Sequence, residues 1–285
     1  MIFRQSASRE ADRDNADAAI LKCGYFAVVE NLAAVIVSGG HGECQPVNGE
    51  NLPKALLPVA GRPLLEHQLE WLKTAGIDSA ILCLDSKPEQ IRARFGDGSA
   101  LGIKLRYCVA DVPRGTAGLI KSLGAASLPD DILVLFGDIY PRTDCSRMIS
   151  LHRTHQALAT LALHGCGRKM PSPGVSCRGR AARCAELHGC AGEVVALGPG
   201  QRIVDFPLCA AADQPGFALS PLWIIRRGIF HFVPDNLPSD FVKDVFPAVI
   251  KAGEALVGYH ESGLLADIGS PQRYALFSQE LAKKR

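Results

Sequence analysis

The sequence is poor in the features that mark several specialised protein classes. Only 6% of its 285 residues are aromatic, and its formal net charge is just +2. It also lacks the run of about 20 apolar residues that a transmembrane helix needs. A nearly neutral chain has no strong positive field to gather nucleic acid. The first 17 residues mix Arg, Glu and Asp without an apolar stretch. We therefore expect a cytoplasmic protein with no signal peptide, no membrane partner and no nucleic-acid partner.

Cys-x2-Cys pairs, the usual mark of a zinc site, are missing from the densest group of metal-ligand residues although the chain has ten cysteines. That group is His164, Cys166, Cys177, Cys184, His188 and Cys190. We interpret the stretch 164–192 as a Gly- and Arg-rich surface loop and the other cysteines as free, mostly buried thiols. A zinc-containing interaction protein built around this loop is the more distant alternative.

What the chain does have is an ordinary globular composition, with 47% hydrophobic and 21% charged residues. Residues 1–31 are interpreted as an N-terminal extension and residues 32–285 as one domain. Apolar patterning predicts strands at 33–37, 77–84, 103–109, 131–136, 157–163, 193–197, 201–206 and 218–225. It predicts helices from Pro63 to about Gly76 and at 87–95, 115–126, 147–156 and 241–252. This alternation indicates an α/β fold with a mainly parallel sheet flanked by helices.

Ligands of such sheets bind beyond the carboxyl ends of the strands. The first strand ends in the turn Ser38, Gly39, Gly40, His41, Gly42, and the strand at 131–136 ends at Gly137 and Asp138. Glycines let backbone N–H groups approach a phosphate without a Cβ in the way. Taken alone, the first turn is equally consistent with a tight connection between a strand and a helix.

Several separated motifs follow this turn. Residues 52–67 read Leu-Pro-Lys-Ala-Leu-Leu-Pro-Val-Ala-Gly-Arg-Pro-Leu-Leu-Glu-His. Later motifs are Pro-Arg-Gly-Thr-Ala-Gly at 113–118, Phe-Gly-Asp at 136–138, Lys-Asp-Val-Phe-Pro at 243–247, Gly-Tyr-His at 258–260 and Asp-Ile-Gly-Ser-Pro-Gln-Arg-Tyr at 267–274. In order and spacing, from about residue 32 to 281, the set resembles the sugar-1-phosphate nucleotidyltransferases, also called nucleotide-sugar pyrophosphorylases.

The resemblance implies a Rossmann-like fold of the nucleotide-diphospho-sugar transferase type. It also implies an enzyme that joins an NTP and a sugar 1-phosphate into an NDP-sugar and releases pyrophosphate. Lys54 matches the lysine that contacts phosphate, and Asp138 and Asp267 match the pair that holds one Mg²⁺. Because the two carboxylates would share one ion, we expect them about 5–7 Å apart. The residues expected to bind substrate are Ser38, Gly39, Gly40, Gly42, Arg114, Gly115 and Thr116.

The sequence departs from the family pattern where substrates are bound. Glu43 and Cys44 stand where the family has Thr-Arg, Ala110 falls at the base-contacting position, and residues 206–208 lack the expected lysine. The alternative is therefore a catalytically impaired member that acts as a regulatory or nucleotide-sugar-binding protein. The turn at 38–40 and the motif at 243–247 are most like the mannose- and heptose-1-phosphate guanylyltransferases. Other bases and sugars stay open, as does assembly into a homo-oligomer.

Overall fold

A computed structural model describes residues 32–38, 45–47, 50–85, 87–109, 114–142, 144–166, 194–206, 216–235, 238–260 and 265–283. The proposed N-terminal extension 1–31 lies outside these ranges. So do Gly39, Gly40 and Gly42 of the first turn and residues 167–193 of the Cys/His-rich stretch. No helix among the described residues is long and apolar enough to span a bilayer.

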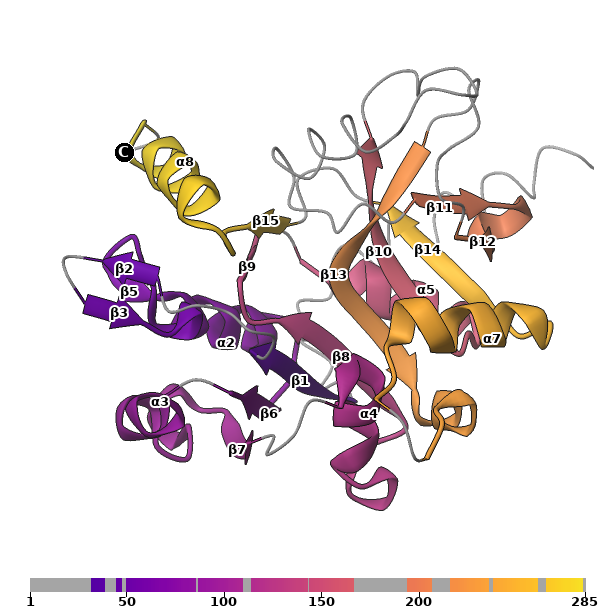
Figure 1. Ribbon diagram of the computed structural model, residues 1–285, viewed down its shortest axis with the longest axis horizontal. Coiled ribbons are helices and arrows are strands. Elements are labelled where there is room, and N and C mark those ends of the chain that lie inside the picture. The colour runs from indigo at the N-terminus through magenta and orange to yellow at the C-terminus, as the bar shows by residue number, and fades with distance from the viewer. Residues whose placement is uncertain are drawn as a thin grey trace, which may run out of the picture.

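Short strands and helices alternate along most of the chain (Figure 1). The strands are β1 (Leu32–Ser38), β2 (Gln45–Val47), β3 (Glu50–Leu52), β4 (Pro58–Val59), β5 (Arg62–Pro63), β6 (Ser79–Leu84), β7 (Lys104–Val109), β8 (Asp131–Phe136), β9 (Ile139–Pro141), β10 (Ala159–Cys166), β11 (Val194–Leu197), β12 (Ile203–Asp205), β13 (Gly216–Arg226), β14 (Leu256–His260) and β15 (Leu265–Asp267). The α-helices are α2 (Leu64–Thr74), α3 (Pro88–Phe95), α4 (Gly115–Ser122), α5 (Ser146–His155), α7 (Phe246–Lys251) and α8 (Pro271–Lys283).

One large mixed sheet forms the centre of the protein. Its main path runs β12-β11-β13-β8-β1-β6-β7, and β10 pairs with both β13 and β14. β1 is parallel to both β6 and β8, and β6 is parallel to β7. β13 is antiparallel to β8. The prediction of a mixed, mainly parallel sheet flanked by helices is confirmed.

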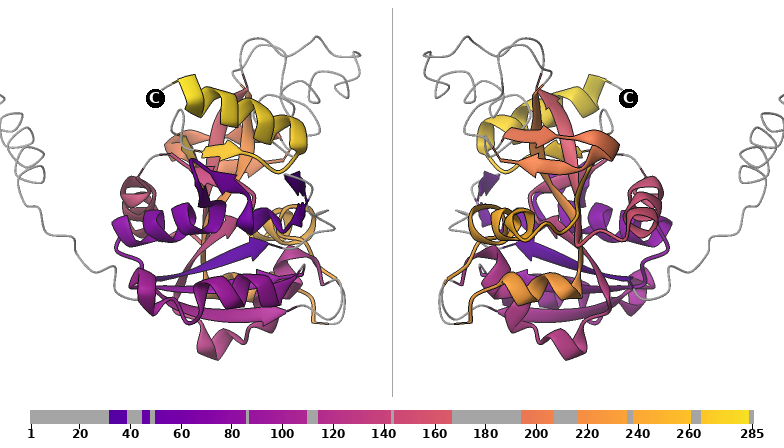
Figure 2. Two further views of the ribbon diagram at one scale, coloured as in Figure 1. Left: turned by 90° about the vertical axis from the view of Figure 1, so that its left-hand side faces the viewer. Right: turned by 90° about the vertical axis from the view of Figure 1, so that its right-hand side faces the viewer.

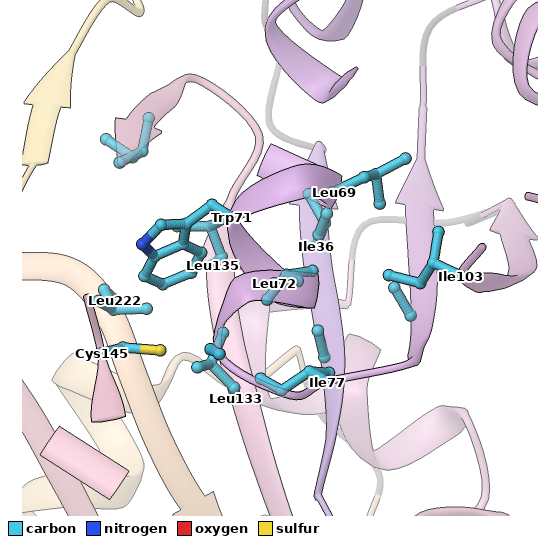
Figure 3. Packing of buried hydrophobic residues seen from close by; sticks show 14 of the residues in the cluster. Ile36, Leu69, Trp71, Leu72, Ile77, Ile103, Leu133, Leu135, Cys145 and Leu222 are labelled. Carbon is cyan, nitrogen blue, oxygen red and sulfur yellow. The ribbon is translucent and has the colours of Figure 1, made fainter. Parts of the chain in front are cut away.

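Burial on both faces of the sheet explains why β1 is apolar at almost every position. Its alternate residues Leu32, Ala34 and Ile36 pack into a core with α2, α3 and α5 (Figure 3). Val35 and Val37 point the other way, into a core with α4 and α7. This is the period of two expected for a strand that is covered on both sides. In the side views, α8 lies across the top of the molecule next to β15 (Figure 2).

Three predicted elements differ from the observed ones. The helix predicted at 115–126 ends at Ser122, because Gly124 turns the chain with a φ of +87°. The helix predicted at 241–252 consists of a π-helical turn, Phe241–Val245, followed by α7. Pro247 has no N–H to donate, so one continuous α-helix through it would lose a backbone hydrogen bond. The first three residues of the stretch predicted as a loop, 164–166, belong instead to β10, which pairs with β13 as far as Cys166.

Candidate active site

Two parallel strands end side by side. Their carboxyl ends are where α/β sheets generally bind ligands. β1 ends at Ser38, and Val37 lies opposite Phe136, the last residue of β8. The Gly137 N–H donates a hydrogen bond to Val37 O over 2.9 Å. A Cβ on Gly137 would lie 2.8 Å from Ser38 Oγ, so this close approach requires glycine. Ser38 therefore lies beside the turn that carries Asp138.

A small two-stranded sheet brings Asp267 to the same turn. In the antiparallel pair of β9 and β15, Asp267 lies opposite Ile139. The Ile268 N–H donates to the backbone oxygen of Asp138 over 2.9 Å. A Cβ added to Gly269 would lie 3.0 Å from Asp138 Cγ and 3.2 Å from Asp267 Oδ1. The two carboxyl groups are thus no farther apart than the sum of these distances, with a residue between them that has no side chain.

Each carboxylate has a cationic neighbour. Lys54 Nζ lies 3.1 Å from Asp138 Oδ2, and both side chains are about a quarter exposed, at 24% and 27%. Arg273 Nε lies 3.2 Å from Asp267 Oδ1, which also accepts a hydrogen bond from the Gly269 N–H over 2.8 Å. Arg273 belongs to α8, and Lys54 belongs to a 3₁₀ turn between β3 and β4. Three segments distant in sequence, which carry Lys54, Asp138, and Asp267 with Arg273, therefore meet at one cluster of charges.

Burial, and after it the negative charge of Asp138, raise the pKa of Asp267 to about 6. The Gly269 N–H, Arg273 and Lys54 act in the opposite direction but do not cancel the shift. Two carboxylates held this close repel each other, and a divalent cation between them would relieve that repulsion. Hard carboxylate oxygens suit Mg²⁺, which is commonly bound by one or two carboxylates together with substrate phosphates. Within the described ranges, no group of three or more His, Cys, Asp or Glu residues forms a metal site.

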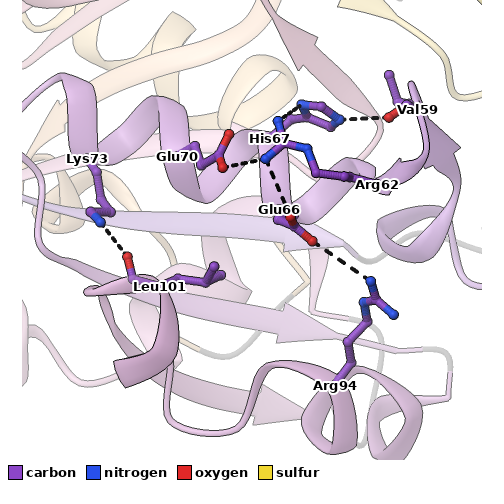
Figure 4. Close-up of polar contacts among 8 residues, drawn as sticks. All are labelled: Val59, Arg62, Glu66, His67, Glu70, Lys73, Arg94 and Leu101. Carbon is purple, nitrogen blue, oxygen red and sulfur yellow. Dashed lines mark hydrogen bonds and ion pairs between the residues drawn. The ribbon is translucent and has the colours of Figure 1, made fainter.

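A network on α2 holds the segment that follows Lys54 (Figure 4). Arg62, in the β4–β5 hairpin, forms ion pairs with Glu66 and Glu70. Its guanidinium also donates to His67 Nδ1 over 3.3 Å, while His67 Nε2 lies 2.8 Å from Val59 O. With Nδ1 accepting, Nε2 carries the proton and donates to that carbonyl. The hairpin is thereby fixed to the helix that packs under the active-site edge.

The last helix is held by contacts around the small sheet. The Tyr274 hydroxyl donates to Pro58 O over 2.5 Å. The rings of Phe277 and Tyr140 pack with centroids 4.9 Å apart. Arg142 forms a 2.8 Å ion pair with Glu280. These contacts connect α8, which carries Arg273, to β4 and β9.

The predicted residues Arg114, Gly115 and Thr116 lie at the start of α4, against the segment before the π-helical turn. Gly115 has a φ of +68°, and the Ser239 N–H donates to Arg114 O over 2.8 Å. The Thr116 hydroxyl donates to Asp240 Oδ2 over 2.8 Å and accepts from the Phe241 N–H at 3.1 Å. The Arg114 side chain is exposed.

The structure therefore brings Lys54, Asp138 and Asp267 together, with Ser38 beside the Asp138 turn. Three neighbours of this cluster were not among the predicted site residues: Gln68, Gly269 and Arg273. Gly269 and Arg273 belong to the motif at 267–274, but nothing in their spacing marks them as contacts of the aspartates. Gln68 did carry a signal, because it is a polar residue on the apolar stripe of α2, four positions after Leu64.

Comparisons with known proteins find similarity to nucleotidyltransferases. The family model described as nucleotidyl transferase matches residues 33–172. The mannose-1-phosphate guanylyltransferase of Mycobacterium tuberculosis is 29% identical over 252 residues, which cover 88% of this chain and 64% of that protein. The D-glycero-α-D-manno-heptose 1-phosphate guanylyltransferase of Aneurinibacillus thermoaerophilus is 31% identical over 132 residues, 46% of this chain and 57% of that one. The chain thus spans less than two thirds of the length of these relatives.

Solved structures share the fold. HddC from Yersinia pseudotuberculosis superposes with a TM-score of 0.64 at 18% identity, covering 87% of this chain and 99% of HddC. A putative glucose-1-phosphate thymidylyltransferase from Bacillus anthracis superposes with a TM-score of 0.66 at 18% identity, covering 89% of this chain and 96% of that chain. Together with the matched family model and the guanylyltransferase relatives, these similarities bear out the resemblance seen in the motifs. In its motifs, in the matched family model and in the relatives named above, the chain resembles the sugar-1-phosphate nucleotidyltransferases.

Proposed function

We propose that the protein transfers a nucleotidyl group from an NTP to a sugar 1-phosphate, forming an NDP-sugar and pyrophosphate. The observation that carries this proposal is the cluster of Lys54, Asp138 and Asp267 at the carboxyl edge of the sheet, beside the end of β1. A sugar-phosphate oxygen attacks the α-phosphorus in line, and the bond from the α-phosphorus to the bridging oxygen of the pyrophosphate breaks. No covalent intermediate with the protein is needed.

The chain's own residues reduce the repulsion between the two anionic substrates. Lys54 supplies positive charge to the phosphates, and the backbone of the turn at Ser38, Gly39, Gly40 and Gly42 donates N–H groups to them. Exposed Arg114 supplies charge in place of the missing family arginine at Cys44. Gly115 and Thr116 hold the start of α4 against the segment at 239–241 and so shape the wall of the substrate site.

One Mg²⁺ fits the paired carboxylates, and Asp138 and Asp267 would hold it. When bound, it would neutralise charge on the triphosphate and pyrophosphate. Two supporting features are the raised pKa of Asp267 and the absence of any side chain at Gly269, between the carboxyl groups. The similarity to guanylyltransferases favours GTP with mannose 1-phosphate or a heptose 1-phosphate as the first substrates to test. Because NTPs are cytoplasmic metabolites, we place the activity in the cytoplasm.

Pyrophosphate release tests the proposal directly. The purified protein is assayed with Mg²⁺, four NTPs and a panel of sugar 1-phosphates. We expect turnover with at least one pair, and a loss of about 10²–10³-fold or more in Asp138→Asn. Asp78→Asn is the matched control, since Asp78 is exposed just before β6, at the amino ends of the parallel strands and so away from the cluster. If the parent binds an NDP-sugar but makes no product with any NTP, the protein is a regulatory or binding member of the family instead.

A further inference from the structure

A buried glutamine underlies the turn that carries Asp138. Gln68 lies on α2 with no exposed surface, among the leucines that pack against the sheet. Its Nε2 donates to Phe136 O over 3.0 Å and to Ile139 O over 2.7 Å. These two carbonyl groups flank Gly137 and Asp138, so one side-chain amide joins the end of β8 to the start of β9.

The orientation of this amide follows from its partners. Both neighbours are carbonyl oxygens, which accept hydrogen bonds and cannot donate them. The NH₂ group must therefore face them, and Oε1 points away. Oε1 is buried and has no hydrogen-bond partner among the residues that the structure describes. A buried acceptor without a partner is unfavourable, so Gln68 contributes its two donor bonds at a cost in desolvation.

An apolar residue at this position would avoid the unpaired acceptor but would leave two carbonyl groups without their donor. The remaining bonds of the turn come from other directions. Gly137 donates to β1 through Val37 O, and Asp138 O accepts from Ile268. The turn is thus held from the β1 side, from the Asp267 segment, and from below by α2. Loss of the support from α2 would free the backbone on both sides of Asp138.

We propose that Gln68 is a positioning residue, which acts through the backbone of the turn at 136–139 to hold the Asp138 carboxylate where it can share a cation with Asp267. The inference rests on the proposed function, because it assumes that the two aspartates bind a divalent metal. It makes Gln68 a supporting residue that touches neither the metal nor the substrate. Loss of such support around a metal ligand typically weakens binding about 10–100-fold.

Binding of Mn²⁺ alone, followed by electron paramagnetic resonance of the free ion, tests this without relying on turnover. Gln68→Met keeps most of the side-chain volume and removes both donors. Leu69→Met is the matched control, since Leu69 is equally buried on the same helix and packs only in the apolar core. Asp138→Asn reports the loss of the metal site itself. Thermal unfolding of each variant checks that the fold is retained.

We expect wild type and Leu69→Met to bind Mn²⁺ with the same affinity, Gln68→Met to bind about 10-fold more weakly or worse, and Asp138→Asn to lose the site. Equal affinity of wild type and Gln68→Met, within twofold, would overturn the role of Gln68 and leave the proposed function intact. A wild-type protein that binds no Mn²⁺ would refute the metal site and the role of Gln68 with it. If Gln68→Met does not fold, Gln68→Asn is measured instead. It keeps the amide but is one methylene too short to reach both carbonyls, and it carries the same expectation.

Discussion

Lys54 Nζ lies 3.1 Å from Asp138 Oδ2, although the two residues are 84 positions apart in the chain. The ammonium group therefore occupies part of the space in which a cation would meet the Asp138 carboxylate. An incoming metal ion and its phosphate ligands would compete with this pair. Lys54 would then be free to bind the substrate phosphates, as we propose.

Replacing Lys54 with Gln should lower turnover by about 10²–10³-fold, because one positive charge near the transferring phosphate is lost. The same change should leave Mn²⁺ binding unchanged or stronger, since a competing cation has been removed. Lys104→Gln is a suitable control because Lys104 is exposed at the start of β7, away from this edge. Pyrophosphate release and Mn²⁺ titration measure the two effects. Weaker Mn²⁺ binding in Lys54→Gln would contradict the competition.

Gly269 should tolerate no side chain. A Cβ at this position would lie 3.0 Å from Asp138 Cγ and 3.2 Å from Asp267 Oδ1, so one of the carboxyl groups must move. We expect Gly269→Ala to weaken Mn²⁺ binding and turnover by about 10–100-fold while the protein still folds. The comparison is Gly228→Ala, whose added Cβ would meet Leu158 at an ordinary 3.5 Å. Similar metal binding in both variants would show that the carboxyl groups adapt freely.

The core of this fold could be predicted from the sequence because it depends on local apolar pattern. The run at 33–37 is uninterrupted, as a strand buried on both faces requires, and β1 is such a strand. The first and last residues of the helices are less predictable from this pattern. The helix expected at 241–252 breaks into two kinds of helix around Pro247, and the bonds that the Asp240 carboxylate accepts from Val242 and Lys243 fix where the first begins.

The meeting of Asp138 with Asp267 could not be derived from pattern alone. It depends on the pairing of two three-residue strands, β9 and β15, which are too short to give a periodic signal. The family resemblance suggested the pair, and the geometry around Gly269 brings it together. Gln68 was overlooked for a different reason. A single polar residue on an apolar helix stripe indicates a buried hydrogen bond but not its partners, which here belong to another part of the chain.

Thr116 offers a test of how the second predicted substrate-binding segment works. Its hydroxyl already donates to Asp240 and accepts from the Phe241 N–H. Removing it in Thr116→Val should lower the free energy of unfolding by about 1–3 kcal/mol, because the partly buried Asp240 carboxylate and Phe241 N–H lose a hydrogen-bond partner. Because we propose that this segment lines the substrate site, we expect KM for the NTP to rise more than kcat falls. Thr154→Val, on the exposed face of α5, should change neither the free energy of unfolding nor KM for the NTP. A large fall in kcat with unchanged stability would instead indicate direct contact of Thr116 with the reacting phosphates.

Asp267 should make the protein's stability fall as pH rises. Burial, together with the negative charge of Asp138, raises its pKa from the ordinary 3.8 to about 6. The folded state therefore holds the proton more tightly than the unfolded state. The favourable contribution is complete below pH 3.8 and is lost as the pH rises through about 6. At about 1.4 kcal/mol per pKa unit, the change is up to about 3 kcal/mol.

Denaturant unfolding of wild type and Asp267→Asn from pH 4 to pH 8, without divalent metal, measures this contribution. The stability of Asp267→Asn relative to wild type should increase up to about pH 6 and then stay level. Asp131→Asn should behave in the opposite way. Burial acts to raise the pKa of Asp131, but the hydrogen bond from His152 and the charges of His152 and Arg226 lower it overall. Wild type should therefore lose stability relative to Asp131→Asn as the pH falls below the ordinary pKa of 3.8, so this pair is also measured below pH 4, and the difference should stay level at higher pH. Parallel curves for wild type and Asp267→Asn would mean that the carboxyl group of Asp267 titrates normally, which would contradict its burial and its closeness to Asp138.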